Sequence, residues 1–282
     1  MTSRIVYGSR ESRPAWRMPH ISLTAALIGG AVMAGVIGSV VAVMLPALQL
    51  KDIAVSGLET LDEHAVREKI AQGLAGSRFL LVPRSSYFLA NTSVLAEDLR
   101  RAFPAISSIS AKKTFPHTLA IAVTERRFWG IMCNDLQSES EAEAPRTAPS
   151  HCVALDTTGF GYESSPRPQG NLILIVETDR AILNAGEQQI ELTLMDRLEI
   201  LRGGIQEATG QEVTRFALRE RSPSEIRARS ADGFAIYFRR DDDFVNAFRV
   251  LKKVLDAEIG NRRDELAYID VRFGNKVFYK FK

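Results

Sequence analysis

The side chains that could perform catalysis or hold a metal ion are few and scattered along this chain of 282 residues. The four histidines are His20, His64, His117 and His151, and none of them lies in a His-Glu-x-x-His motif or beside a Cys-x-x-Cys pair. His64 precedes Glu68 on one expected helix face, but that spacing is too common to indicate zinc. The sequence therefore predicts no metal site.

Other catalytic signatures are also missing from the sequence. It contains no Gly-x-Ser-x-Gly elbow and no phosphate-binding loop, and the pair Gly203-Gly204 is interpreted as a helix end. The three carboxylates at 241–243 could suggest a cation site, but acidic residues at a helix start cap the helix and suit its dipole. We therefore predict a protein that is not an enzyme and that needs no cofactor.

An uncharged apolar run at residues 21–45 decides where the rest of the chain is located. A helix rising ~1.5 Å per residue needs ~20 such residues to cross the hydrocarbon core of a bilayer. Pro46 then ends the run, because proline removes a backbone donor. A cleaved signal peptide is the main alternative, but its apolar part spans only ~7–15 residues. We predict a transmembrane helix over residues 21–46.

The charges on either side of this span predict its orientation. Residues 1–20 hold four arginines and one glutamate, whereas Lys51 and Asp52 cancel each other after the span. The positive-inside rule places the arginine-rich tail in the cytoplasm and everything from Lys51 onward outside it. The outer part is nearly neutral, which argues against nucleic acid as a partner.

Small residues recur at every fourth position within the span, which would place them along one stripe of the helix. They are Ala26, Gly30, Ala34, Gly38 and Ala42. Such a stripe lets another helix backbone approach closely, so it indicates a packing face for a partner or for self-association. The alternative is that alanine and glycine are simply common in membrane helices.

The outer part is predicted to be α+β, with one domain at 50–126 and a second at 127–282. Alternating or four-residue apolar spacing in the first domain predicts a strand, two helices and two further strands. They are expected at 52–56, 61–75, 92–103, 106–113 and 119–124. Adjacent helices and adjacent strands imply a three-stranded sheet with both helices on one face. Thr60 and Glu63 predict a capping box at the first helix.

The second domain is predicted to be a larger mixed β domain with helices packed on its sheet. A fully buried strand is expected at 172–176. Two helices share an i, i+4, i+7, i+11 pattern of apolar residues, namely Leu194, Leu198, Leu201 and Ile205, and Phe244, Phe248, Leu251 and Leu255. Residues 134–151 are acidic and rich in Ser, Ala and Pro, which predicts a mobile loop.

Two cysteines, Cys133 and Cys152, bracket that acidic loop. An even number of cysteines outside the cytoplasm permits a disulfide bond, which would fix the base of the loop. Two buried free thiols are the alternative.

Several stretches resemble one family of proteins. Residues 53–58 (Ile-Ala-Val-Ser-Gly-Leu) resemble the opening strand of an FtsQ-type POTRA domain, and residues 115–126 (Phe-Pro-His-Thr through Glu-Arg) resemble its closing strand. Together with the preceding span, they are similar to FtsQ/DivIB cell-division proteins. Residues 154–159 and 268–273 resemble parts of the family's β domain. The chain departs from the family by lacking a proline soon after Glu125-Arg126 and by carrying the acidic insertion.

The resemblance implies a bitopic scaffold of the bacterial divisome that links early and late division proteins. Its outer domains would bind FtsB/FtsL-type (DivIC/FtsL) partners and hold the septal peptidoglycan synthase complex. It would be located in the plasma (inner) membrane at the division septum, with its C-terminus periplasmic or extracellular. A POTRA-type chaperone or secretion component and an anchored cell-envelope enzyme are the alternatives. The chain shows one POTRA-like unit and no series of barrel strands, which favours the scaffold.

The last strand pattern, at 277–281, is expected to form a sheet edge because no later segment covers it. The resemblance implies that a partner strand adds beside it, so the candidate partner-binding residues are Phe273, Val277, Phe278, Tyr279, Lys280 and Phe281. The alternative is that these aromatics only complete the core. The pair Glu125-Arg126 is either a solvated hinge or a fixed joint between the two outer domains.

Overall fold

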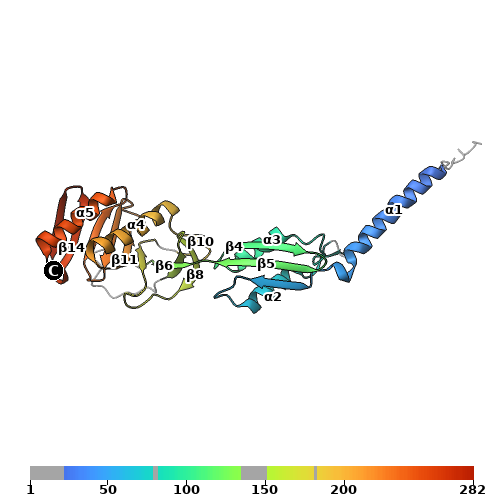
Figure 1. The fold of residues 1–282 in the computed structure, drawn as a ribbon, viewed down its shortest axis with the longest axis horizontal. Helices are drawn as coiled ribbons and strands as arrows, with labels where there is room; N and C mark the ends of the chain where they lie inside the picture. Colours follow the sequence, from blue (N-terminus) through green and yellow to red (C-terminus); the bar gives the residue numbers. More distant parts are fainter. Residues whose placement is uncertain (1–21, 79–81, 135–150, 181–182) are drawn as a thin grey trace, which may run out of the picture.

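The computed structural model describes residues 22–78, 82–134, 151–180 and 183–282. These form an elongated molecule, with an apolar helix at one end, a three-stranded sheet in the middle and a ten-stranded sheet at the other end (Figure 1). The expected cytoplasmic tail at 1–20 and nearly all of the expected acidic loop lie outside the described residues. The α+β class predicted from the sequence is confirmed.

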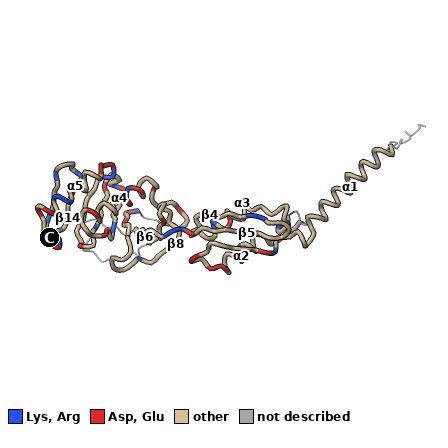
Figure 2. Tube along the Cα trace, viewed as in Figure 1, with Lys and Arg blue, Asp and Glu red and all other residues tan. Residues whose placement is uncertain are grey.

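The apolar helix is α1 (Leu23–Met44), and Figure 2 shows no basic or acidic residue along it. The stretch Leu27–Met44 is long and apolar enough to cross a membrane, and none of it is buried. Pro46 opens a short 3₁₀ helix, Pro46–Leu48, directly afterwards. Among the stripe positions, a Cβ added at Gly30 or Gly38 would meet nothing within 4 Å, and the side chain of Ala26 lies outside the described residues. The packing stripe thus stays a prediction.

The middle unit has the predicted order of strand, two helices and two strands. Its main elements are β1 (Asp52–Ser56), α2 (Glu63–Leu74), α3 (Thr92–Ala102), β4 (Ile106–Thr114) and β5 (Thr118–Glu125), with a small ladder of β2 (Ser77–Arg78) and β3 (Val82–Pro83). The sheet order is β1-β5-β4, with β1 parallel and β4 antiparallel to β5. Both helices bury their apolar stripes, which include Val66, Ile70, Leu95 and Leu99, in one core with the sheet.

The predicted capping box at α2 is wrong. The helix begins at Glu63, and its N-cap is Asp62, whose carboxylate accepts the N–H of His64 at 3.0 Å. Thr60 lies before the helix and instead donates its hydroxyl to Glu125 at the end of β5. A tertiary contact with a distant carboxylate therefore replaces the expected local cap.

The C-terminal region forms one ten-stranded sheet. Its strands are β6 (Phe128–Cys133), β7 (Cys152–Asp156), β8 (Phe160–Ser165), β9 (Ile175–Thr178), β10 (Glu187–Gln188), β11 (Val213–Leu218), β12 (Glu225–Ser230), β13 (Ala235–Arg239), β14 (Leu266–Phe273) and β15 (Lys276–Phe281). Their spatial order is β10-β8-β7-β6-β9-β11-β12-β13-β14-β15. The helices are α4 (Leu192–Thr209) and α5 (Phe244–Val254), and a π turn, Leu255–Ile259, and a 3₁₀ turn, Arg263–Glu265, follow α5.

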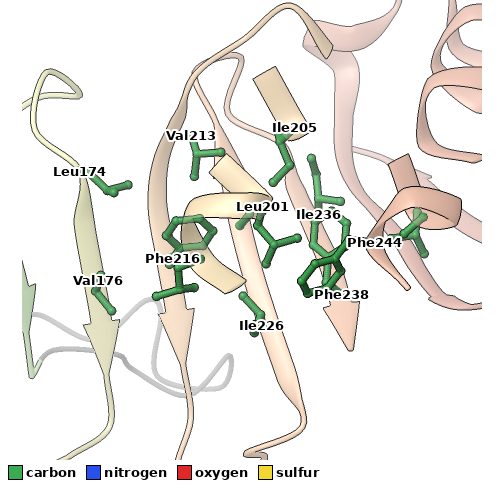
Figure 3. Packing of buried hydrophobic residues seen from close by; sticks show 14 of the residues in the cluster. Leu174, Val176, Leu201, Ile205, Val213, Phe216, Ile226, Ile236, Phe238 and Phe244 are labelled. Carbon is green, nitrogen blue, oxygen red and sulfur yellow. The ribbon is translucent and has the colours of Figure 1, made fainter. Parts of the chain in front are cut away.

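The main core of this region lies between the two helices and one face of the sheet. Figure 3 shows Leu201 and Ile205 of α4 in one cluster with Phe216, Ile226 and Ile236 of the strands. All five side chains are buried, as the four-residue apolar spacing of the helix and the alternation of the strands predict. The core therefore fixes the positions of β11 to β15 relative to one another.

The strand predicted at 172–176 is displaced toward the C-terminus. The strand β9 begins only at Ile175, and Leu172 is fully exposed. The preceding residues include Pro166, Pro168 and Gly170, the last with a φ of 80°, so the chain enters the sheet late. An apolar run alone does not fix where pairing begins.

The interpretation of Gly203-Gly204 as a helix end is also wrong. The helix α4 continues to Thr209 and ends at Gly210, whose φ of 75° is left-handed. A Cβ at Gly204 would lie 2.1 Å from a ring carbon of Phe248 on α5. Gly204 therefore allows the two helices to approach each other closely.

Candidate functional site

The strand β15 is the last strand of the large sheet and pairs only with β14. Ile269 lies opposite Tyr279, and Asp270 lies opposite Phe278. Along its other side, β15 has no neighbouring strand within the part of the chain that the structure describes. A strand at such an edge presents backbone N–H and C=O groups that a further strand can pair with.

The six candidate partner-binding residues divide into two groups. Val277 and Phe281 pack against the main core, and the Phe281 ring also lies 4.3 Å from the guanidinium carbon of Arg262. Phe273, Phe278 and Tyr279 are open to solvent, with 54%, 53% and 39% of their surface exposed, and Lys280 is exposed beside them. The rings of Phe273 and Phe278 meet edge to face with centroids 5.3 Å apart. Exposed, mutually supported rings at a free strand edge are suited to receiving a partner segment.

A group of polar and aromatic side chains, not foreseen from the sequence, lies beside this edge. It lines a surface hollow formed by Arg219, Ser222, Glu225, Arg227, Tyr237, Tyr268, Asp270 and Arg272. The rings of Tyr237 and Tyr268 have centroids 5.6 Å apart, and Asp270 accepts a hydrogen bond of 2.6 Å from Arg272. Hydrogen bonding to Asp270 and the charges of Asp270 and Glu225 raise the pKa of Arg272. The guanidinium of Arg272 is therefore held charged between the carboxylates of Asp270 and Glu225 in this hollow.

Part of this group could have been predicted. Tyr268, Asp270 and Arg272 are two residues apart along one strand, so the period of a strand places them on one face. Tyr237 and Glu225 come from two other strands, and only the observed register, such as Tyr237 opposite Asp270, brings them together. The sequence has no signal for that register.

The joint between the two sheets is built by Glu125 and Arg126. The Glu125 carboxylate accepts the N–H groups of Glu59 at 2.8 Å and Leu61 at 3.1 Å, together with both donors of Thr60. Burial disfavours the charged carboxylate, but the hydrogen bonds from Thr60 and its neighbours outweigh burial and lower the pKa of Glu125. Glu125 thus holds the end of β5 to the segment that precedes α2.

Arg126 connects the middle unit to the C-terminal sheet. Its Nε donates to the carbonyl of Pro104 at 2.9 Å, and its Nη1 lies 2.5 Å from Oδ2 of Asp156 at the end of β7. Its guanidinium carbon is also 3.8 Å from the centroid of the Phe160 ring. Only 16% of the Arg126 side chain and 4% of the Asp156 side chain are exposed. The interpretation of this pair as a solvated hinge is therefore wrong.

Asp156 also organises the turn into β8. Its Oδ1 accepts the hydroxyl and the N–H of Thr158, both at 2.7 Å, and the N–H of Phe160 at 3.1 Å. Burial disfavours its charged form, but the Thr158 hydroxyl, Arg126 and these N–H groups outweigh burial and lower the pKa of Asp156. One carboxylate thus holds both the turn and the joint.

Cys133 and Cys152 are directly opposite each other in the β6–β7 ladder, and a disulfide bond joins them with an S–S distance of 2.04 Å. Both are buried with Ile131 and Ile175 in a small cluster that is separate from the main core. The bond therefore connects the two ends of the acidic segment, 19 residues apart in sequence.

The carboxylates at the start of α5 have structural partners. Asp243 is the N-cap and accepts the N–H of Val245 at 3.1 Å, and Asp242 accepts a hydrogen bond of 2.6 Å from Arg239. Across the residues that the structure describes, no group of three or more His, Cys, Asp or Glu side chains could hold a metal ion. Asp243 therefore caps the helix as the sequence predicts, whereas Asp242 pairs with Arg239.

The middle unit matches a known protein family. Residues 48–126 match the family model of the POTRA domain, FtsQ-type. No curated protein matches the chain. The fold and the match together define a protein with one helix suited to anchoring it in a membrane, a POTRA domain and a larger β-rich region. More narrowly, the matched model is the FtsQ type of POTRA domain, which supports the resemblance to division-associated FtsQ/DivIB proteins found in the sequence.

Proposed function

We propose that this protein is a bitopic scaffold of the bacterial divisome. Helix α1 anchors it in the plasma (inner) membrane, with the arginine-rich tail in the cytoplasm and the C-terminus periplasmic or extracellular. At the septum it links early and late division proteins, including FtsB/FtsL-type (DivIC/FtsL) partners and the septal peptidoglycan synthase complex. The observation that carries this proposal is the FtsQ-type POTRA domain directly after a membrane-length helix.

Within this function, residues 50–126 and 127–282 act as two domains that recruit partners without catalytic turnover. FtsQ-type POTRA proteins are non-enzymatic scaffolds, which supports this assignment. The match to the FtsQ-type model also disfavours the chaperone or secretion alternative. Hydrolysis of purified cell wall by the full chain would favour the envelope-enzyme alternative instead.

The partner adds a strand along the free side of β15. Backbone hydrogen bonds supply part of the affinity, and Phe273, Phe278 and Tyr279 supply apolar contacts on the two faces of the new strand pair. Val277 and Phe281 hold β15 on the core, so they contribute to binding only through the position of the strand. Lys280 limits indiscriminate pairing of the edge.

Alanine substitution tests this docking mode. Phe278→Ala and Tyr279→Ala should each weaken binding of the purified FtsB-type partner at least about tenfold, since an aromatic anchor typically contributes ~2 kcal/mol or more. Val245→Ala is the matched control, because Val245 is an apolar residue that is 67% exposed but belongs to helix α5 and not to β15. Calorimetric titration gives the affinities. Wild-type affinity in both folded variants would exclude β15 as the docking edge.

Localisation tests the division function itself. A functional fluorescent fusion should be enriched at midcell in dividing cells, and depletion of the protein should block septation. A functional fusion spread evenly around the envelope would contradict the proposal.

A further inference from the structure

The end of the POTRA domain that carries α1 is tied closely to that helix. Tyr87 donates its N–H to the carbonyl of Leu48 at 2.8 Å, and Lys51 donates to the carbonyl of His117 at 3.0 Å. Leu48 and Lys51 follow the last residue of α1, Met44, by only four and seven positions. Figure 1 shows α1 joining this end of the domain, with β6 leaving from the opposite end. Any membrane that α1 crosses therefore lies beside this end.

This end exposes a cluster of apolar side chains, the interfacial patch, which consists of Tyr87, Phe88, Leu89 and Phe115. Phe115 is 65% exposed, Phe88 56% and Leu89 43%. Tyr87 lies between the two phenylalanines, with ring centroids 5.6 Å from Phe88 and 5.8 Å from Phe115. Grouped, exposed aromatic side chains indicate a contact surface.

Basic side chains surround the interfacial patch. The ammonium of Lys113 lies 5.3 Å from the Tyr87 ring centroid and donates to the Tyr87 carbonyl at 2.7 Å. Arg84 and Lys51 are exposed on the neighbouring segments. Aromatic rings and basic side chains together are the composition that proteins use at the headgroup level of a bilayer.

We propose that the interfacial patch docks onto the lipid headgroup region of the leaflet from which the Met44 end of α1 emerges. The tether to α1 holds the rings beside this surface at a high effective concentration, so contacts too weak for a free domain suffice here. Docking fixes the POTRA domain against the bilayer and thereby the direction in which the C-terminal sheet points. The proposal requires α1 to cross the membrane, but it does not depend on the orientation or on the division function.

Fluorescence quenching by lipids tests this docking. The full chain is placed in nanodiscs of phosphatidylcholine with phosphatidylglycerol, with quenchers at the headgroup level of the lipids. An environment-sensitive dye is attached to Phe88→Cys or Phe115→Cys, which is selective because the two native cysteines are bonded to each other. Phe128→Cys is the matched control, since Phe128 is 50% exposed at the opposite end of the POTRA domain.

We expect the dyes at positions 88 and 115 to be quenched several times more strongly than the dye at position 128, without any other protein present. Equal quenching at the three positions would overturn the proposal. A second set of variants separates docking from simple proximity. A dye on Leu89→Cys should lose its quenching when Phe88→Asp and Phe115→Asp are added while circular dichroism stays unchanged. Unchanged quenching in that folded variant would also overturn the proposal, because the tether alone would then hold the surfaces close.

Discussion

Substitution of Arg126 by methionine should loosen the joint between the POTRA domain and the C-terminal sheet. Methionine keeps the apolar stem of the side chain but removes the ion pair with Asp156 and the hydrogen bond to Pro104. The carboxylate of Asp156, whose side chain is 4% exposed, would then lose its cationic partner and keep the donors of Thr158 and Phe160. Removing one partner of a buried ion pair typically lowers the free energy of unfolding by ~3–5 kcal/mol. Because Arg126 is partly exposed, we expect a loss at the lower limit, about 3 kcal/mol.

Urea unfolding of the full chain in detergent micelles measures this effect. Trp129, buried in β6 and hydrogen-bonded to Glu199 at 2.7 Å, reports the unfolding of the C-terminal sheet by its fluorescence. Arg127→Met is the control, because Arg127 is exposed, and it should change the free energy of unfolding by less than ~0.5 kcal/mol. A double-mutant cycle with Asp156→Asn should give a coupling of about 1–3 kcal/mol. If Arg126→Met unfolds like Arg127→Met, the ion pair does not hold the joint.

Three further predictions concern the C-terminal region. Gly204→Ala should lower the free energy of unfolding, measured by urea titration, by about 1–3 kcal/mol, because the new Cβ overlaps the Phe248 ring. Adding Phe248→Leu should restore part of this loss. Loss of the disulfide in the double variant Cys133→Ala, Cys152→Ala should lower the free energy of unfolding by roughly 3 kcal/mol, as the chain-entropy model gives for a loop of this length. Mass analysis under non-reducing, denaturing conditions checks the bond itself, and alkylation of both native thiols would reject it. Because the folded-state pKa of Asp156 is lowered, its stabilisation should be complete above about pH 4 and decrease as the pH falls through the folded-state pKa. Asp156→Asn should flatten that part of the pH–stability profile, and an unchanged slope would contradict this assignment.

The elements that sequence reasoning located correctly are those with a strong local period. The apolar residues of α4 and α5 recur at helical spacing, and both helices form, although α4 continues past the expected end at Gly203-Gly204 to Thr209. Thr60 has an equally good local signal for a cap, yet its hydroxyl binds Glu125, 65 residues away, because that contact satisfies several backbone donors at once. A local pattern cannot indicate which distant carboxylate competes for the same group.

At the candidate docking edge, too, the local sequence pattern indicates the faces of the strand but not its distant neighbours. The alternation at 277–281 predicts which side chains share a face, and the structure places Val277 and Phe281 on the core. The ten-strand order, by contrast, depends on pairings such as β9 with β11, which no local motif encodes. The hollow beside Phe278 follows from those pairings, so the sequence could not indicate it.

Site-specific photo-crosslinking in dividing cells tests whether β15 is the edge to which the partner binds. A photoreactive amino acid replaces Phe278 on the free edge or, as the control, Val245 on α5. We expect position 278 to crosslink to a small single-pass FtsB-type protein and position 245 not to do so. If cells divide normally and the partner is crosslinked from position 245 alone, or from neither position, β15 is not the surface through which this protein assembles the divisome.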